Sequence, residues 1–503
     1  MKLHGLRGCS RTIRNLTSID QALPDDVLYM VLEQACVVPQ EVFPPWQLPS
    51  FTSGLSTFSS DAARTLSSVC RRWRQLLSNP IVWSDVSVFT RSVEGMHWVD
   101  TCLSRSKHMK SMVRIGQPAK RRCDRGIGIP AVVARHQSKI RGLYLRIGAV
   151  SDFDFMNTEM VNLERLHLAD SSLPGGNHPT AFSLAKFPEL RMLILEGGHL
   201  FSAKELMHIT DLTLDSCTFL IDLSTIFAVA PIEKLRLRKV PIVRGNVKAV
   251  PNLKLLVIES TTFIEILTAL PALPTTVKVY IHDQWTPSTR RSRLGMLPIP
   301  YSIFGDRNPV YTVSVSIHLR MVSFVLHTSN GGRTEVITEA APGITDDSAR
   351  AFVKALFADI GTRSVLINAC SMEINVHPTA THLICENTIN HLLSAASWIT
   401  QLFLRGPLLF HHVCNALSSD QDHGRLLPGL ASLNMNLCRN DSFLEDLPLL
   451  NDVVASRPAM WKIAFSGTEK QTRSILKEYG LFAERLQDQG IRVLLLTSSP
   501  LSM

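Results

Sequence analysis

The stretch IRGLYL at residues 140–145 and the stretch LERLHL at residues 163–168 share the spacing L-x-x-L-x-L, with apolar residues at the first, fourth and sixth places. The same spacing begins again at eight later positions: Leu190, Ile209, Ile232, Leu253, Ile399, Leu430, Met460 and Ile491. Weaker copies begin at Thr362 and Ala380. Each copy predicts a short strand that turns its fourth and sixth residues toward a core.

Short strands that recur every ~20–30 residues are typical of a leucine-rich-repeat solenoid, in which each repeat buries its apolar face against its neighbours. We therefore expect an α/β fold with an irregular leucine-rich-repeat-like solenoid over 136–503, an open curved sheet with helices on its convex side. Cys217, Cys370 and Cys438 follow a copy where such repeats carry a buried Asn or Cys. An ordinary α/β domain with leucine-rich strands is the alternative.

The repeat pattern breaks at about residues 283–345. Strict alternation from Tyr311 to Ile317 predicts a strand, and apolar residues at 322–326 and 336–337 predict two more. The turn residues Asn330-Gly331-Gly332 separate the last two, as in a β-hairpin. These strands either extend the solenoid sheet or interrupt it.

A separate helical unit precedes the repeats. The stretch ALPDDVLYMVL at 22–32 predicts a helix that begins at Pro24, carries two Asp residues in its first turn and ends near Cys36. A loop is expected at 37–59, and a second helix from Ser60 to Leu77. Two short helices bury too little to be stable alone, so their apolar surface meets either a partner or the rest of the chain.

The helical unit resembles the F-box family. The resemblance rests on Leu23-Pro24-Asp25-Asp26-Val27-Leu28, then on Leu66 to Arg74 with its Val-Cys-x-x-Trp core, and then on Pro80-Ile81-Val82-Trp83. The segment Cys102-Leu103-Ser104-Arg105-Ser106 is similar to the Leu-x-Arg-Ser segment of F-box proteins from mushroom-type fungi. Asp26 replaces the usual Glu, and the loop at 37–59 is longer than is common in the family.

The resemblance implies a substrate-recognition adaptor of an SCF-type cullin–RING ubiquitin ligase. Its partners would be a Skp-type adaptor, the cullin scaffold and a target protein that the sequence does not identify. Nine residues are predicted to contact the Skp-type adaptor or to hold the contacting surface in shape: Leu23, Pro24, Val27, Leu28, Val31, Leu32, Val69, Trp73 and Trp83. The expected domains are a disordered basic lead at 1–19, the F-box-like domain at 20–90, a connecting segment at 91–135 and the solenoid.

Residues beside the inward pair of each strand would face the concave surface of the solenoid. Eight of them are predicted to bind the target: Tyr144, Arg165, His167, Lys234, Arg236, Arg238, Phe403 and Arg405. The row Lys234-Arg236-Arg238 could attract an acidic or phosphorylated segment. A solvated strand face is the alternative for any one of these residues.

Composition narrows the function classes. The chain of 503 residues is 45% hydrophobic and carries a formal net charge of +9, without a block of five or six like charges, so nucleic-acid binding is expected only as a less favoured alternative. No apolar run is long enough for a membrane span. Scattered cysteines and the lack of targeting signals predict a cytoplasmic or nuclear protein.

No sequence motif predicts catalysis. P-loop, nucleophile-elbow and zinc-protease motifs are missing, and His411-His412-Val413-Cys414, the nearest group to a metal site, fits a helix surface and core better. We expect no enzyme activity, catalytic residue, metal or cofactor. The main alternative function is a ligase-independent binding scaffold, in which the helical unit only caps the solenoid.

Overall fold

The structure is a computed structural model, and the chain divides into two compact units. Unit 1 comprises Met1–Leu220 with Thr225–Ile232, and unit 2 comprises Ile221–Ser224 with Glu233–Met503. The structure describes residues 23–36, 60–91, 93–118, 128–147, 150–170, 181–197, 200–201, 203–217, 221–240, 243–259, 266–267, 269–271, 273–285, 310–340, 345–363, 369–394, 396–406, 408–418, 426–436, 447–467, 480, 483–484 and 486–497. The expected lead at 1–19 and loop at 37–59 lie outside these ranges.

In the described residues, the amino-terminal helical unit contains three α-helices and a 3-10 turn. They are α2 (Asp25–Cys36), α3 (Ser60–Ser67), α4 (Arg71–Leu76) and η1 (Pro80–Trp83). Helix α2 ends at Cys36, as the sequence predicts, and begins at Asp25, one residue after Pro24. The single helix expected from Ser60 to Leu77 is wrong, because it is broken into α3 and α4.

The break follows from local hydrogen bonding. The hydroxyls of Ser67 and Ser68 donate to the carbonyls of Arg64 and Thr65, which ends α3. Cys70 is extended, with φ −154° and ψ 171°, and its Sγ accepts a hydrogen bond from the Trp73 backbone N–H. A helix N-cap has this geometry, so α4 starts afresh after Cys70.

Trp83 joins the helical unit to the residues that follow it. Its indole is buried and its Nε1 donates to the Leu77 carbonyl at 2.7 Å. The ring meets Trp98 edge to face at a centroid distance of 5.8 Å, and the Arg105 guanidinium lies 4.5 Å from its centroid. Trp98 and Arg105 belong to α5 (Val93–Arg105), so the helical unit and the start of the sheet share a core.

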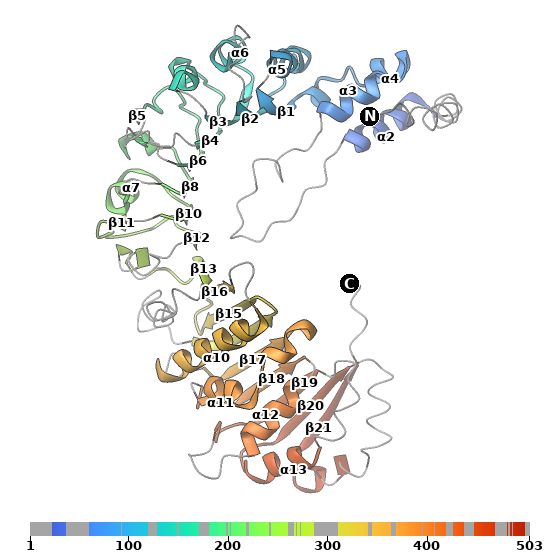
Figure 1. The fold of residues 1–503 in the computed structure, drawn as a ribbon, viewed down its shortest axis with the longest axis vertical. Coiled ribbons are helices and arrows are strands. Elements are labelled where there is room, and N and C mark those ends of the chain that lie inside the picture. Colours follow the sequence, from blue (N-terminus) through green and yellow to red (C-terminus); the bar gives the residue numbers. More distant parts are fainter. Residues whose placement is uncertain are drawn as a thin grey trace. The chain divides into compact units, whose positions relative to one another are not determined.

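Unit 1 contains an open sheet of six parallel strands. In spatial order they are β1 (Asp85–Arg91), β2 (Ser111–Pro118), β3 (Ile140–Ile147), β4 (Arg165–Asp170), β6 (Met192–Glu196) and β8 (Asp211–Asp215). The connections carry α5, α6 (Ile129–His136), η2 (Val150–Asn157), η3 (Ala203–Leu206) and a small pair of strands, β5 (Ala181–Phe182) with β7 (Leu200–Phe201). Helices α5 and α6 lie on the same side of the first three strands (Figure 1).

The sheet begins earlier than the sequence predicts. Residues 91–135 are not a connecting segment, because β2, α5 and α6 lie there and β1 already pairs with β2. Val86 and Val88 of β1, like Val113 and Ile115 of β2, are buried at alternate positions. These β-branched residues fill the core positions that leucines fill in later strands, so the L-x-x-L-x-L spacing does not detect them.

Eleven described strands of unit 2 form an open sheet, again given in their order along the ladder. They are β10 (Lys234–Arg238), β12 (Leu255–Glu259), β13 (Lys278–Trp285), β16 (Arg333–Ala340), β15 (Met321–Thr328), β14 (Val310–His318), β17 (Ser371–Val376), β18 (Gln401–Arg405), β19 (Ser432–Asn436), β20 (Lys462–Gly467) and β21 (Arg492–Thr497). A short pair, β9 (Ile221–Asp222) with β11 (Val243–Arg244), is separate. Mixed α/β with large open sheets is therefore the class of fold.

Helices accompany the strands of unit 2. They are α10 (Asp346–Arg363), η6 (Pro378–Leu383), α11 (Glu386–Ser394), α12 (Leu409–Ser418) and α13 (Leu447–Ala455), while α7 (Leu223–Val229) follows β9. Helices α10 to α13 follow one another along the same side of β17–β21 (Figure 1). The opposite side of these strands is therefore free of α10–α13.

The segment 283–345 extends the sheet. Strand β16 pairs in parallel with β13, β15 pairs antiparallel with both β16 and β14, and β14 pairs in parallel with β17. The expected hairpin turn joins β15 to β16, with Gly331 at φ 85°, a value that favours glycine. Among the described strands of this sheet, only β15 runs against the others, so the ladder continues through the segment.

The ten full copies of the spacing all correspond to strands. In the first six copies the fourth and sixth residues are buried, as in Leu143 with Leu145 and Leu256 with Ile258. The copy at Ile491 is out of register, because Val493 and Leu495 align with the buried Ile463 and Phe465.

The weaker copy at Ala380 is wrong, because Ala380 lies in η6. Thr362 lies in α10, and the fourth and sixth residues of its copy lie outside the described residues; the strand of this region is β17. Cys370 consequently precedes a strand, Cys217 follows β8 and is buried as expected, and Cys438 lies outside the described residues.

Candidate functional site

The outer side of α2 is an exposed apolar stripe. Val27, Met30 and Val31 stand at helical positions i, i+3 and i+4, and 67% of Met30 and 53% of Val31 are accessible. The other side of the same helix buries Leu28 and Leu32. The inward residues of α2 form the packed core of the helical unit, so the stripe remains as exposed apolar surface that this core does not use.

A second segment stands beside the start of α2. The Arg72 guanidinium donates to the carbonyl of Leu23 at 2.7 Å and to the Asp25 carboxylate at 2.7 Å. Val69, three residues earlier in the turn between α3 and α4, is exposed. We call Val27, Met30, Val31 and Val69 the helical-unit surface.

The predicted adaptor-binding residues divide into two groups. Pro24, Val27, Val31 and Val69 are exposed and Leu23 is half-buried, so these side chains can reach a partner. The remaining four are buried and hold the unit in shape: Leu28, Leu32, Trp73 and Trp83. Met30, the most exposed of the apolar residues on α2, was missed by the prediction, although its spacing from Val27 indicates it.

Two of the predicted target-binding residues in unit 1 are not accessible. Tyr144 is 1% exposed and His167 is also buried, so neither faces solvent. Parallel strands lie about 4.8 Å apart, and large side chains at matching positions cover one another. The Arg114 guanidinium lies 5.2 Å from the Tyr144 ring, and His167 Nε2 lies 2.7 Å from a carboxylate oxygen of Glu196.

Burial also sets the ionisation of Tyr144. Desolvation raises the pKa of its phenol, against the opposing effect of the Arg114 charge. Arg114 in turn forms a buried ion pair with Asp85 on β1. Of the three residues predicted in unit 1, only Arg165 is partly accessible, and the other two belong to a packed polar layer.

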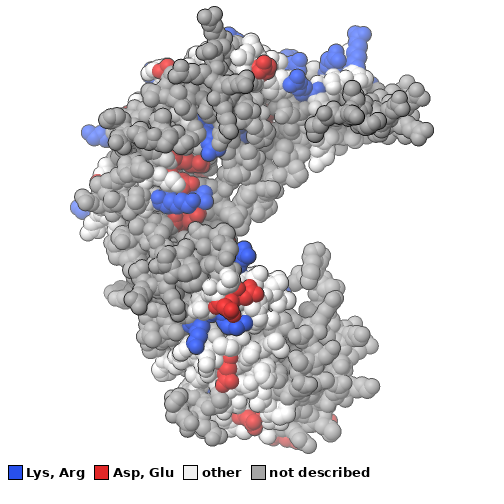
Figure 2. Space-filling view, viewed as in Figure 1, with Lys and Arg blue, Asp and Glu red and all other residues white. Residues whose placement is uncertain are grey.

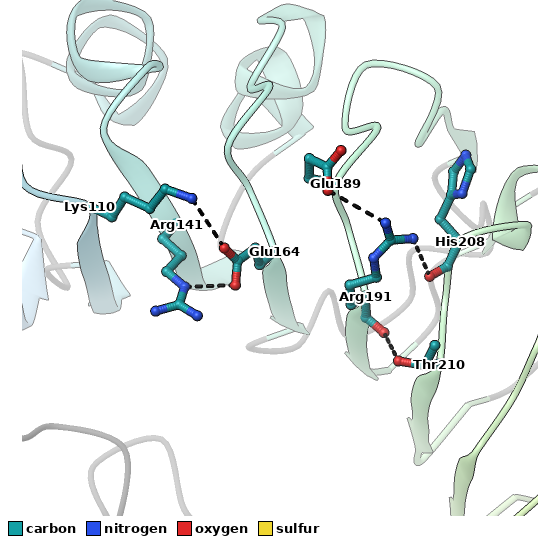
Figure 3. A network of polar contacts seen from close by, with 7 residues as sticks. All are labelled: Lys110, Arg141, Glu164, Glu189, Arg191, His208 and Thr210. Atoms are coloured by element: carbon teal, nitrogen blue, oxygen red, sulfur yellow. Dashed lines mark hydrogen bonds and ion pairs between the residues drawn. The ribbon is translucent and has the colours of Figure 1, made fainter.

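The starts of the unit 1 strands carry a polar network (Figure 3). Glu164 receives Arg141 Nε at 2.7 Å and Lys110 Nζ at 3.4 Å, and its backbone N–H donates to the Arg141 carbonyl. Burial alone would raise the pKa of the Glu164 carboxyl, but the hydrogen bonds and charges of Arg141 and Lys110 lower it overall. Further along, Arg191 lies 3.5 Å from Glu189. These exposed cations are therefore neutralised within the chain.

The basic row on β10 is also partly neutralised. Lys234 is exposed, while Arg236 and Arg238 are half-buried. The Arg238 Nε lies 2.9 Å from Glu259 Oε2 on β12. Burial would raise the pKa of the Glu259 carboxyl, but its contacts with His282 and Arg238 lower it overall. An ion-paired Arg238 weakens the prediction that three free charges lie on this strand.

Phe403 and Arg405, also predicted to bind the target, are accessible. Both are exposed on β18, and the buried Leu402 and Leu404 point the other way. On the face drawn in Figure 2, Lys and Arg side chains lie close to Asp and Glu side chains in the middle of the view, and several Lys and Arg side chains lie together at its upper right. Exposed strand faces, rather than a large charged patch, are thus the candidate sites of the sheet.

Neither a protein-family model nor a curated protein sequence matches the chain. Within the described ranges, no three His, Cys, Asp or Glu side chains are grouped closely enough to hold a metal ion. Among the same residues, no helix combines the length and the apolar character of a membrane span. The candidate sites described above are the helical-unit surface and the exposed strand faces.

Proposed function

We propose that the protein is a substrate-recognition adaptor of an SCF-type cullin–RING ubiquitin ligase, with an F-box-like helical unit and a leucine-rich-repeat-like array. The helical unit would dock on a Skp-type adaptor, and the array would hold a target protein. The single observation that supports the proposal best is the exposed stripe of Val27, Met30 and Val31 on a helix whose other side is fully packed. Apolar stripes of this kind suit a partner that lays its own apolar surface against them.

The motif residues support the same interpretation. Leu23 and Pro24, which carry the F-box resemblance, lie at the start of α2, where the Arg72 contacts hold them beside α4. The buried Trp73 and Trp83 are the aromatic residues of the other two motif segments. The resemblance therefore covers both the exposed residues and the residues that position them.

The proposed mechanism is tethering. A target held on the array beside a ubiquitin-charged conjugating enzyme would present its lysines at a high effective concentration, so the attack on the thioester becomes nearly intramolecular. The groups that make and break bonds would belong to other subunits. As a partner of such a ligase the protein would act in the cytoplasm or the nucleus.

Charge insertion on α2 tests the proposal. Val27→Asp with Val31→Asp should abolish co-purification of the full-length chain with a Skp-type adaptor and leave its melting temperature unchanged, because both side chains are exposed. Val161→Asp, at an exposed valine of unit 1, is the matched control and should keep the adaptor. Leu23→Ala with Pro24→Ala should also lose it. Adaptor binding that survives both double substitutions would overturn the proposal.

One observation favours a second candidate, a ligase-independent scaffold. The contact between Trp83 and Trp98 packs the helical unit on α5, next to the first strand of unit 1, where the end of a repeat array needs a cap. If the helical unit only caps the array, no Skp-type adaptor should co-purify with the unaltered chain. The same role predicts that Val27→Asp with Val31→Asp leaves binding of every partner unchanged.

A further inference from the structure

One strand face of unit 2 differs from the others in charge. Strands β18 to β21 carry twelve side chains on the side away from the buried Leu402 and Leu404; ten of them are at least partly accessible, while Ser432 and Ala464 are buried. We call them the β18–β21 face: Gln401, Phe403, Arg405, Ser432, Asn434, Asn436, Lys462, Ala464, Ser466, Arg492, Leu494 and Leu496. Three are cations and none is an acid, whereas the neighbouring β17 places Glu373 opposite Phe403.

The cations of this face are not neutralised by the described part of the chain. Lys462 and Arg492 stand directly opposite each other on β20 and β21, an arrangement of like charges that is unfavourable by itself. Within the described ranges, neither these two side chains nor Arg405 forms an ion pair. By contrast, Lys110, Arg141 and Arg238 each lie beside a carboxylate. A negatively charged partner would therefore be attracted by these cations, and it would also reduce the repulsion between Lys462 and Arg492.

Apolar side chains accompany the cations. Leu496, turned onto this face by the register of β21, is 50% exposed, and Phe403 on β18 is also exposed. Lone exposed apolar residues need no explanation, but two on one uncompensated basic face indicate a contact surface.

We propose that the β18–β21 face binds an extended acidic segment of the target protein, one that carries apolar side chains between its acidic residues. Four strands span about 14 Å, the length of four or five extended residues. Lys462 and Arg405 are two strands and four residues apart on the ladder, a separation of about 16 Å. Two acidic residues about five positions apart would reach both cations and place the residues between them over Phe403 and the neighbouring Asn434.

The proposal rests on the proposed function in taking the segment to be part of a ligase target. A nucleic acid fits the face less well. Three separated cations offer few phosphate contacts, and Phe403 is the only aromatic side chain among the twelve, too few for stacking successive bases.

Selection from random peptides tests the proposal without a known target. Full-length protein is panned against a phage-displayed library of random twelve-residue segments, and enriched peptides are synthesised for anisotropy measurements. We expect enriched segments with two acidic residues about five positions apart and apolar residues between them. Lys462→Glu with Arg492→Glu should raise their dissociation constant about tenfold or more. The control variant, Lys248→Glu with Lys278→Glu, changes two exposed lysines outside the face and alters the net charge by the same amount. It should change the dissociation constant of the peptides less than about twofold.

Three results would overturn the proposal: no enrichment, enriched segments without acidic residues, or binding that the reversal of Lys462 and Arg492 leaves intact. A labelled twelve-nucleotide oligouridine serves as the second probe, and tight binding of it, lost in the same variant, would replace the peptide by a nucleic acid. Skp-type adaptor binding is measured in parallel and should survive the reversal. An unaltered chain that selects acidic segments but does not bind the adaptor would refute the proposed function and leave the segment-binding face standing.

Discussion

Arg72 on α4 holds Asp25 in the first turn of α2, with Nη2 2.6 Å from the carboxylate, across 47 residues of sequence. The same nitrogen donates to the Leu23 carbonyl just before the helix. One guanidinium thus joins the two segments that carry the helical-unit surface. Both residues belong to the motifs recognised in the sequence, but the motifs do not predict that they touch.

Loss of Arg72 should weaken the contact between α4 and the start of α2. Arg72→Ala removes an exposed ion pair and one hydrogen bond to a carbonyl, so we expect a loss of about 1 kcal/mol in the free energy of unfolding. Urea unfolding followed by tryptophan fluorescence measures it. Arg71→Ala, one position earlier on the same helix and exposed, is the control and should change stability by less than about 0.5 kcal/mol. Equal effects of the two substitutions would show that the contacts of Arg72 with Leu23 and Asp25 contribute nothing to the free energy of unfolding.

Arg457 should be the most sensitive polar residue of unit 2. It is 1% exposed, and its Nη2 donates to the carbonyls of Leu417 at 3.0 Å and Leu426 at 2.8 Å. Arg457→Met keeps the apolar stem and leaves both carbonyls without this donor, so we expect a loss of about 2 to 4 kcal/mol. Lys248→Met, at an exposed position of unit 2, is the control. Hydrogen exchange should show the loss in α12 and α13 first, and unchanged protection there would contradict this role.

The Cys217 thiol should be inert in the folded chain. Burial, assisted by the Asp215 charge, raises the pKa of Cys217 to about 12. The thiol stays protonated at pH 8.5, so iodoacetamide should label Cys217 at least about tenfold more slowly in folded than in urea-unfolded protein. Peptide mass spectrometry measures both rates. Fast labelling of Cys217 in the folded chain would show that the thiol is accessible.

The same shift predicts a decline in stability at high pH. An unfolded thiol ionises near its ordinary pKa of 9.0, while the folded thiol keeps its proton. Stability from this group is therefore complete below pH 9 and falls as the pH rises above it. Cys217→Ala should abolish this part of the pH dependence, which melting curves between about pH 8 and pH 10.5 measure.

His282 should stabilise unit 2 at low pH. Its Nε2 lies 3.3 Å from Glu339, and its Nδ1 lies 3.9 Å from Glu259. Burial lowers the pKa of the imidazole, but the two carboxylates outweigh burial and raise it above its ordinary 6.5. A raised pKa means that the contribution is complete below pH 6.5 and is lost as the pH rises through the folded value.

His282→Gln tests this titration. The variant should melt below the unaltered chain at pH 5.5, by an amount that corresponds to about 1 kcal/mol, and the difference should shrink toward pH 8.5. The solvent-exposed part of the pair with Glu339 limits the size of the effect. A difference that stays constant or grows with pH would contradict the assigned direction.

The strands that could be predicted from the sequence are those where leucine spacing dominates the local signal. Leu143 with Leu145 and Leu402 with Leu404 turn inward because alternate apolar residues leave one favourable face. Strand β1 was missed because Val86 and Val88 pack as well as leucines and do not match the template. In β21 four consecutive apolar residues, Val493 to Leu496, offer either face, and only pairing with β20 selects one.

The predicted binding residues, like the strands, could be placed only in part from the sequence. The motif residues Pro24, Val27 and Val31 are accessible, since their positions on α2 follow from helical spacing. Tyr144 and His167 could not be placed from alternation, because their burial depends on which bulky side chains stand on adjacent strands. The basic β18–β21 face was missed because Lys462 and Arg492 meet only through the register of two strands far apart in sequence.

Strand β15, which runs antiparallel to both of its neighbours, has a consequence for how such an array can change length. Because β14 and β16 both run with the rest, β15 could be gained or lost together with either neighbour while every remaining strand kept its polarity. Loss of β15 with β16 would leave β13 beside β14, two strands of the same direction. Loss of one strand alone would instead demand a new crossover. An insertion or deletion of a whole hairpin, that is of two neighbouring strands, is thus the change that this part of the sheet can accept without a new crossover.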